Sequence, residues 1–193
     1  MSNSMYQGSA KVFVHNLKNL SSVLKAAARN AKARDIEPSV LLSARLAPDM
    51  FTLTRQVQIM TDNAKGCCAR LAGVESPVFE DNEATFADLE ARIQRTLKFI
   101  RSLKAAQFAG SESGEIVMKM QIGQLSFSGA DYLNGWALPN FYFHYTTAYN
   151  ILRHNGVPLG KFDFLGAVPG MQMSGRIAKM MAAKPSAKTK KKS

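Results

Sequence analysis

The chain has 193 residues, 46% of them hydrophobic and 20% charged, which is the composition of a globular protein with a sizeable core. No apolar run approaches the roughly 18 residues that a membrane-spanning helix needs, and the first eleven residues lack the apolar core of a signal peptide. A cytoplasmic protein without a membrane partner is therefore expected. The adjacent Cys67 and Cys68 fit neither a structural disulfide nor a zinc-finger spacing, so we predict reduced core residues.

The formal net charge of +11 is unevenly distributed. From residue 174 onward there are seven basic residues and no acidic one, so this segment carries +7 and the rest of the chain +4. We predict a single domain over residues 1–170 and a basic, flexible tail over residues 171–193. Contact of the tail with nucleic acid is the less favoured interpretation, because the tail has no aromatic residue to stack on bases.

Apolar residues recur at alternating steps of four and three from Tyr6 onward, which predicts a long amphipathic helix ending near Ala33. The apolar positions are Ala10, Phe13, Leu17, Leu20, Leu24 and Ala27. His15 lies away from this stripe, so we expect it to be solvated. Residues 35–48 contain two prolines and predict a connection that packs partly on the core.

A second helix is predicted after Pro48, where apolar residues again alternate steps of three and four. Asp49 stands where an N-cap or first-turn acid favours the helix dipole. Gln56 flanks the apolar seam within reach of the interior, whereas Asp62 is expected on the outer face. Gly73 and a proline four residues later end the helix.

An acidic segment, Glu80 to Glu83, directly precedes another apolar stripe at helical spacing over residues 86–103. Acidic side chains before a helix favour the positive end of its dipole. We therefore interpret residues 80–83 as a cap and an acidic first turn of a third helix, and a metal site as the less favoured alternative.

The apolar period changes to two over residues 116–127, which predicts a short β-hairpin with a turn near Gly123. This hairpin is an insertion between the third helix and the last one. Trp136, the only tryptophan, is expected to cover the end of the helical bundle. Residues 157–170 predict an ordered wrap whose apolar residues return to the core; these are Phe162, Phe164 and Leu165.

The last helix is predicted from Pro139 to Gly156, since proline suits a first helical turn and glycine a stop. His144 falls on its inward apolar stripe, with Asn140 one turn before it. Tyr145 is adjacent. A core histidine satisfied by a polar neighbour is the favoured interpretation, and a ligand or proton carrier is the alternative.

Three stretches of the chain resemble a known family. They read "RLAPDMFTLTRQVQIMTDNAK", "FEDNEATFADLEARIQRTL" and "LPNFYFHYTTAYNILRHNGVPLGKFDFLG". The chain resembles the domain-of-unknown-function family nineteen ninety-three, a distant branch of the DinB and YfiT-like proteins. The resemblance implies an all-α four-helix bundle with a long crossover, and the hairpin is inserted before its last helix.

The wider superfamily carries a divalent metal on three histidines, one from the second helix and two at four-residue spacing on the fourth. Placed on that pattern, His144 matches the second histidine of the pair, Asn140 stands in place of the first, and Gln56 is the nearest polar residue of the second helix. One imidazole and two neutral amides are poor ligands for a transition metal. We therefore predict no cofactor, with a divalent metal centred on His144 as the alternative.

The sequence is compatible with two classes of function, a binding module and an enzyme, and it does not decide between them. The favoured one is a small-molecule-binding or interaction module with a polar pocket formed by His144, Asn140, Gln56 and Tyr145. Its expected partners are a small molecule and a second copy of the chain. The alternative is a metal-dependent enzyme of the DinB-like type, a thiol transferase or hydrolase. No catalytic residue is assigned, because no nucleophile motif or phosphate loop is present.

Overall fold

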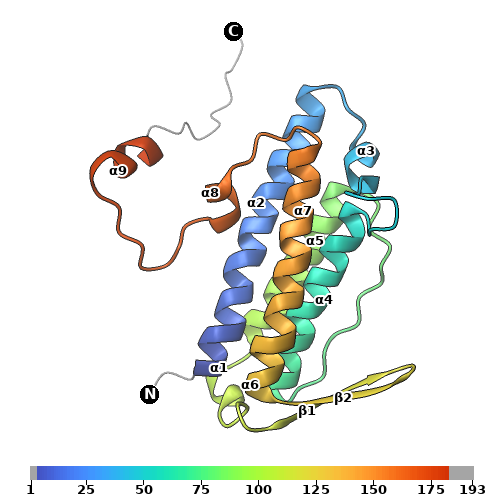
Figure 1. Cartoon of the computed structure of the whole chain (residues 1–193), viewed down its shortest axis with the longest axis vertical. Helices are drawn as coiled ribbons and strands as arrows, with labels where there is room; N and C mark the ends of the chain where they lie inside the picture. Colours follow the sequence, from blue (N-terminus) through green and yellow to red (C-terminus); the bar gives the residue numbers. More distant parts are fainter. Residues whose placement is uncertain (1–3, 183–193) are drawn as a thin grey trace.

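The computed structural model describes residues 4–182, and it is mainly helical with one two-stranded antiparallel sheet. Its long helices, α2 (Val12–Ala33), α4 (Leu53–Ala72), α5 (Phe86–Ser102) and α7 (Leu138–His154), lie side by side (Figure 1). The helix α4 packs against both α5 and α7, and α2 packs against α5. Among the described residues, no helix combines the length and apolar character needed to cross a bilayer.

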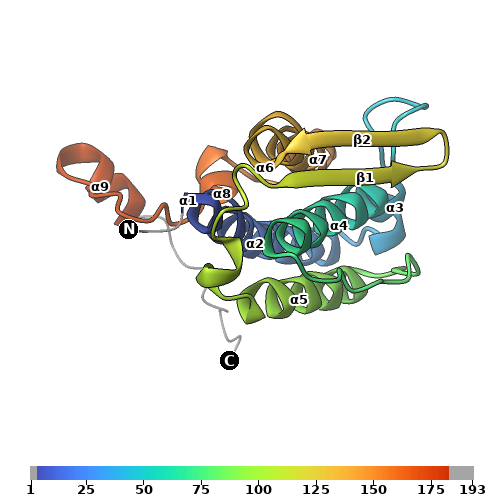
Figure 2. The ribbon, with the colours of Figure 1, turned by 90° about the horizontal axis from the view of Figure 1, so that it is seen from below.

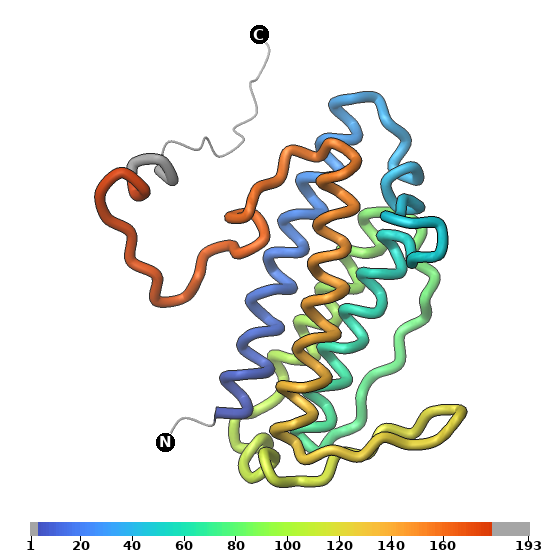
Figure 3. Tube along the Cα trace, in the orientation of Figure 1, coloured from blue at the N-terminus to red at the C-terminus, as the bar shows by residue number. Residues whose placement is uncertain are grey.

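Short elements connect the long helices. They are α1 (Ser4–Tyr6), the π-helix Gln7–Lys11, α3 (Pro38–Ser43), the 3-10 helix Ala105–Phe108, α6 (Gly129–Asp131), the π-helix Tyr132–Ala137, α8 (Lys161–Leu165) and α9 (Gly175–Ala182). The tube in Figure 3 shows the long crossover between α4 and α5 running back along the long helices. The predicted first helix is present as one helical run from residue 4 to residue 33, made up of α1, the π-helix Gln7–Lys11 and α2.

The hydrophobic core follows the apolar spacing of the sequence. The predicted stripe of the first helix is buried at every position, with Phe13, Leu17 and Leu20 fully enclosed. Cys67 and Cys68 are free and buried. Burial raises the pKa of the Cys67 thiol to about 12, so this thiol stays protonated at neutral pH and is a poor nucleophile.

The helix α4 begins later than the sequence pattern predicts. Its N-cap is Thr52, whose Oγ1 accepts a hydrogen bond from the Arg55 backbone N at 3.4 Å. Asp49 is exposed and lies in the connection after α3, so the prediction that Asp49 caps this helix is wrong. The connection is pinned to the helix start by a 2.9 Å hydrogen bond from the Leu53 backbone N to the Ala44 carbonyl, which delays the first turn.

The acidic segment before α5 does not cap that helix. Thr85 is the N-cap and forms a capping box with Asp88. Glu83 instead turns inward, and its side chain is buried against Arg92. The interpretation of residues 80–83 as a cap is therefore wrong, because a fully buried guanidinium on α5 recruits these acids.

Arg92 is fully buried at 0% exposure and joins α5 to α4 and to the crossover between them. Its Nε donates to Thr61 Oγ1 at 2.7 Å, and its Nη1 donates to Glu83 Oε1 at 3.1 Å. Its Nη2 donates to Asp62 Oδ1 at 2.6 Å. Asp62 therefore does not project freely from the outer face as predicted; its carboxylate turns toward α5.

The predicted hairpin is confirmed as β1 (Glu115–Met120) and β2 (Gly123–Ser128), which pair in antiparallel register. Phe127 on β2 contacts Trp136 and Tyr132, each with ring centroids 5.9 Å apart. Figure 2 shows the hairpin on the opposite side of the molecule from α5. Trp136 thus anchors the hairpin at the start of α7.

The chain after α7 folds back along α2 as a segment that we call the strap, residues 159–170. It contains α8, which packs on α2, and its Phe164 ring is half-buried. The strap then leads to α9, which stands away from the long helices (Figure 1). Of the predicted tail, residues 183–193 lie outside the described part of the chain, and residues 175–182 form this helix.

We expect the substitution Arg92→Met to lower the free energy of unfolding by about 3–5 kcal/mol, because it leaves the buried Glu83 carboxylate without its charged partner. Urea unfolding followed by circular dichroism measures this loss. The matched control is Arg95→Met, which removes a half-exposed arginine 3.4 Å from the same Glu83 and should cost about 1 kcal/mol or less. Equal losses for the two variants would contradict the assignment.

Candidate functional site

Two of the residues predicted for the pocket form a hydrogen-bonded pair that joins two long helices. His144 lies in the middle of α7, and its Nδ1 is 2.7 Å from Oε1 of Gln56, which lies in the first turn of α4. Both side chains are almost fully buried. The structure therefore brings together two of the four predicted residues.

The orientation of Gln56 fixes the tautomer of His144. The Gln56 Nε2 donates to the Phe51 carbonyl at 3.2 Å, so Gln56 Oε1 must face the imidazole. Because an amide oxygen only accepts hydrogen bonds, Nδ1 of His144 carries the proton and Nε2 has the lone pair. This Nε2 has no hydrogen-bond partner among the described residues and is not one of the fully buried polar atoms. It is therefore an acceptor that no described residue engages.

The surroundings keep His144 neutral. Burial lowers its pKa below the ordinary value of 6.5, and the positive charge of Arg55 lowers it further. Arg55 is held nearby through an ion pair with Asp81 on the crossover. At neutral pH the imidazole therefore offers Nε2 as an uncharged base or ligand.

The ring of one exposed aromatic residue lies against His144, and a second exposed aromatic residue binds Gln56 through its backbone. Phe143 is 59% exposed, and its ring meets the His144 ring edge-on with centroids 5.2 Å apart. Phe51 is 55% exposed and supplies the carbonyl that orients Gln56. We call the four residues Gln56, His144, Phe51 and Phe143 the imidazole site.

Asn140 does not join the imidazole site through a hydrogen bond. Its Nδ2 donates to the Trp136 carbonyl at 2.8 Å, so the side chain reaches back toward the preceding turn instead of forward to His144. Helical spacing alone places both residues on one face, but it does not fix their rotamers. This local backbone hydrogen bond is a common alternative for asparagine.

Tyr145 lies on α7 and contacts the strap, and it takes no part in the imidazole site. Its hydroxyl donates to the Phe164 carbonyl at 2.8 Å, and its ring stacks on that of Phe164 with centroids 4.0 Å apart. Burial raises the pKa of the Tyr145 hydroxyl, so the group stays protonated and donates. Tyr145 therefore anchors the end of α8 to α7.

The prediction that His15 is solvated is wrong. Its Nε2 is 2.8 Å from the Leu165 carbonyl and donates to it, since a carbonyl only accepts. Asn19 donates to the same carbonyl at 2.8 Å. The residue spacing within the first helix holds no signal for this contact, because the partner lies 150 residues away.

The donor set does not fit the superfamily's three-histidine metal. The Gln56 oxygen is engaged by His144 Nδ1, and the Asn140 amide is engaged by Trp136, which leaves one imidazole nitrogen. Within the described part of the chain, no three His, Cys, Asp or Glu side chains gather closely enough to hold a metal ion. The residues at this position therefore do not fit a metal-dependent reaction.

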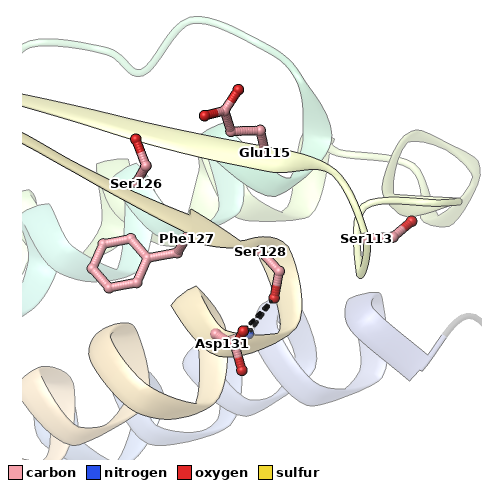
Figure 4. A pocket seen from close by; sticks show the side chains of 6 residues that line it. All are labelled: Ser113, Glu115, Ser126, Phe127, Ser128 and Asp131. Carbon is pink, nitrogen blue, oxygen red and sulfur yellow. Dashed lines mark hydrogen bonds between the residues drawn. The ribbon is translucent and has the colours of Figure 1, made fainter.

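Several hollows open elsewhere on the protein. The one at the base of the hairpin has a volume of about 470 Å³ and is lined by Ser113, Glu115, Ser126, Phe127, Ser128 and Asp131. Figure 4 shows the carboxylates of Glu115 and Asp131 on opposite sides of the hairpin base. The Asp131 Oδ2 accepts a hydrogen bond from Ser128 Oγ at 2.7 Å. These groups do not converge on one ligand position.

Comparison with known proteins now gives the chain a family. The family described as Domain of unknown function (DUF1993) matches residues 5–165. The chain belongs to this family. It is also similar to the crystal structure of a DinB family member protein from Shewanella denitrificans, with 40% sequence identity and a TM-score of 0.82. That match covers 87% of this chain and 95% of the other, so the predicted relation to DinB-like proteins is confirmed.

No curated protein matches the chain. On the alignment that the resemblance implies, His144, Asn140 and Gln56 take the positions of the superfamily's metal ligands. The residue types there, one histidine and two amides, are those of this chain. The site must therefore be interpreted from its own geometry.

We expect part of the pH dependence of stability to come from His144. A folded-state pKa below 6.5 means that, as the pH falls through 6.5, the unfolded chain binds a proton that the folded chain resists. The contribution of His144 to the free energy of unfolding is therefore fully present above pH 6.5, and it is lost as the pH falls from 6.5 to the folded-state pKa. Urea unfolding at about pH 7.5 and 5.5 should show a smaller loss in His144→Gln than in the wild type.

The matched control is His154→Gln, which changes an exposed histidine at the end of the same helix. It should keep the wild-type loss of stability between the two pH values. A His144 pKa at or above 6.5 in an NMR titration of the imidazole would contradict the prediction.

Proposed function

We propose that this DUF1993 protein is a binding or interaction module, built as a four-helix bundle with a long crossover, whose recognition site is the imidazole site. The observation that carries the proposal is the pair of Gln56 hydrogen bonds, which fixes the tautomer of His144 and leaves its Nε2 as the acceptor. An imidazole of fixed tautomer, with the exposed Phe143 ring edge-on beside it, is preorganised for recognition.

The chemistry of the site defines the class of ligand. Nε2 accepts one hydrogen bond, so the ligand presents an O–H or N–H group to it. The exposed Phe143 ring lies edge-on beside the imidazole, so the ligand carries an aromatic or aliphatic group next to that donor. The lowered pKa of His144 supports this reading, because a neutral imidazole accepts whereas a charged one only donates.

The enzyme alternative receives no support from the site. A thiol transferase or hydrolase of the DinB-like type uses a metal held by histidines, and the donor set here does not fit one. The described cysteines are buried, and burial raises the pKa of both thiols. Binding is therefore the function that the geometry supports best.

We expect phenol to bind at the imidazole site more tightly than anisole, which has the same ring without the hydroxyl donor. Affinities for such fragments are about millimolar, so NMR of ¹⁵N-labelled imidazoles is the suitable measurement. Phenol should shift the His144 Nε2 resonance, and His144→Ala should abolish the backbone shifts around Phe51 and Phe143. The control His154→Ala should leave them unchanged. Equal affinities for phenol and anisole would contradict the role of His144 Nε2 as a hydrogen-bond acceptor for the ligand.

Added zinc or nickel should leave the melting temperature of the wild-type protein within a degree or two of its value with chelator. The reason is that one imidazole nitrogen and two engaged amides bind these ions weakly. The measurement is a thermal melt of the tag-free protein, with metal analysis alongside, for wild type and His144→Ala. A gain of several degrees and near-stoichiometric metal in the wild type alone would favour the metal-dependent enzyme.

A further inference from the structure

A groove runs between α2 and the strap, away from the imidazole site. Its volume is about 440 Å³, which lies within the range of small-molecule sites. One wall is a single face of α2 over residues 18–29, and the other is formed by strap residues 159–167. Figure 1 shows α8 lying beside α2 on the side away from α4.

The floor of the groove is apolar. Val23 and Leu159 are buried beneath it, and Phe162 is half-buried along its side. Ala26 leaves space on the α2 wall, because its side chain is a single methyl group. An apolar, elongated body therefore fits along the helix.

Two cations line the groove, Lys18 and Arg29. They are eleven residues apart on α2, which corresponds to about 16 Å along the helix axis. Both are exposed, and neither forms an ion pair with a residue that the structure describes. By contrast, Lys25 on the same helix pairs with Glu90 at 3.0 Å. The acidic Asp163 also lines the groove, where its Oδ2 accepts from the Gly160 backbone N at 2.7 Å.

The strap wall is fixed in place before any ligand arrives. Asn19 donates to the Leu165 carbonyl, and Tyr145 donates to the Phe164 carbonyl. Gly166 has a φ of +64°, and a methyl group there would stand 2.1 Å from Asn19 Oδ1. The groove therefore has two rigid walls, which lowers the ordering cost of binding.

We propose that this groove binds chain-like organic carboxylates, with the apolar chain along α2 and an acidic group at Lys18, at Arg29 or at both. Charge complementarity selects an anion over a neutral amphiphile, because neither cation forms an ion pair with an acidic residue among those the structure describes. The separation of the two cations further favours a molecule with a carboxylate at each end. This site is independent of the imidazole site, since the two share no residue.

Isothermal titration calorimetry of the full chain with decanedioate, decanoate and 1-decanol tests the proposal. The expected order of affinity is decanedioate, then decanoate, then decanol. Lys18→Gln and Arg29→Gln should each weaken decanedioate binding roughly two- to fivefold, the range of partly exposed ion pairs. Lys32→Gln, which changes an exposed lysine of α2 outside the groove, should have no effect.

A second variant tests the groove without changing its charge. Ala26→Leu fills the space on the α2 wall and should weaken decanoate and decanedioate alike, while circular dichroism reports an unchanged helical fold. The proposal is overturned if none of the carboxylates binds, or if decanol binds as tightly as decanoate. It is also overturned if Lys32→Gln weakens binding as much as Lys18→Gln, since the general positive charge of the protein, and not the groove, would then account for the affinity.

Discussion

The buried guanidinium of Arg92 is the constraint on which the arrangement of the central helices depends. Moving a charged group out of water costs several kcal/mol, and the cost is offset only where its hydrogen bonds are all made. Arg92 makes them to α4 through Thr61 and Asp62 and to the crossover through Glu83. The crossover has no regular secondary structure of its own, so these bonds define where it runs.

This network also reaches the imidazole site. Asp81 accepts from Arg92 and from Arg55, and Arg55 lies close enough to His144 to lower its pKa. Through Asp81, the crossover holds Arg55 at the start of α4. The electrostatic environment of His144 therefore depends on a loop that contributes no residue to the imidazole site itself.

Apolar periodicity was sufficient to predict the long helices, the hairpin and the burial of His144 and Gln56. It failed where a charged residue lies inward, because a pattern of apolar residues treats every charge as solvent-facing. Arg92 stands between Leu89 and Thr96 on the buried side of α5, and that position was the available signal. The partners of Asn140 and His15 are backbone carbonyls, which leave no trace in residue type.

The strap has a consequence for the order of folding. The carbonyls at the end of α8 accept hydrogen bonds from side chains of α2 and α7. His15 on α2 is 150 residues from its partner in the chain, and Tyr145 on α7 is 19 residues from its partner. A five-residue helix has no stability of its own in water. The strap can therefore dock only after α2 and α7 have packed together. In the native state it should open before the long helices do, and the amide hydrogens of the strap should then exchange first. The groove beneath it is thus the last recognition surface to form and the first to be lost when the protein begins to unfold.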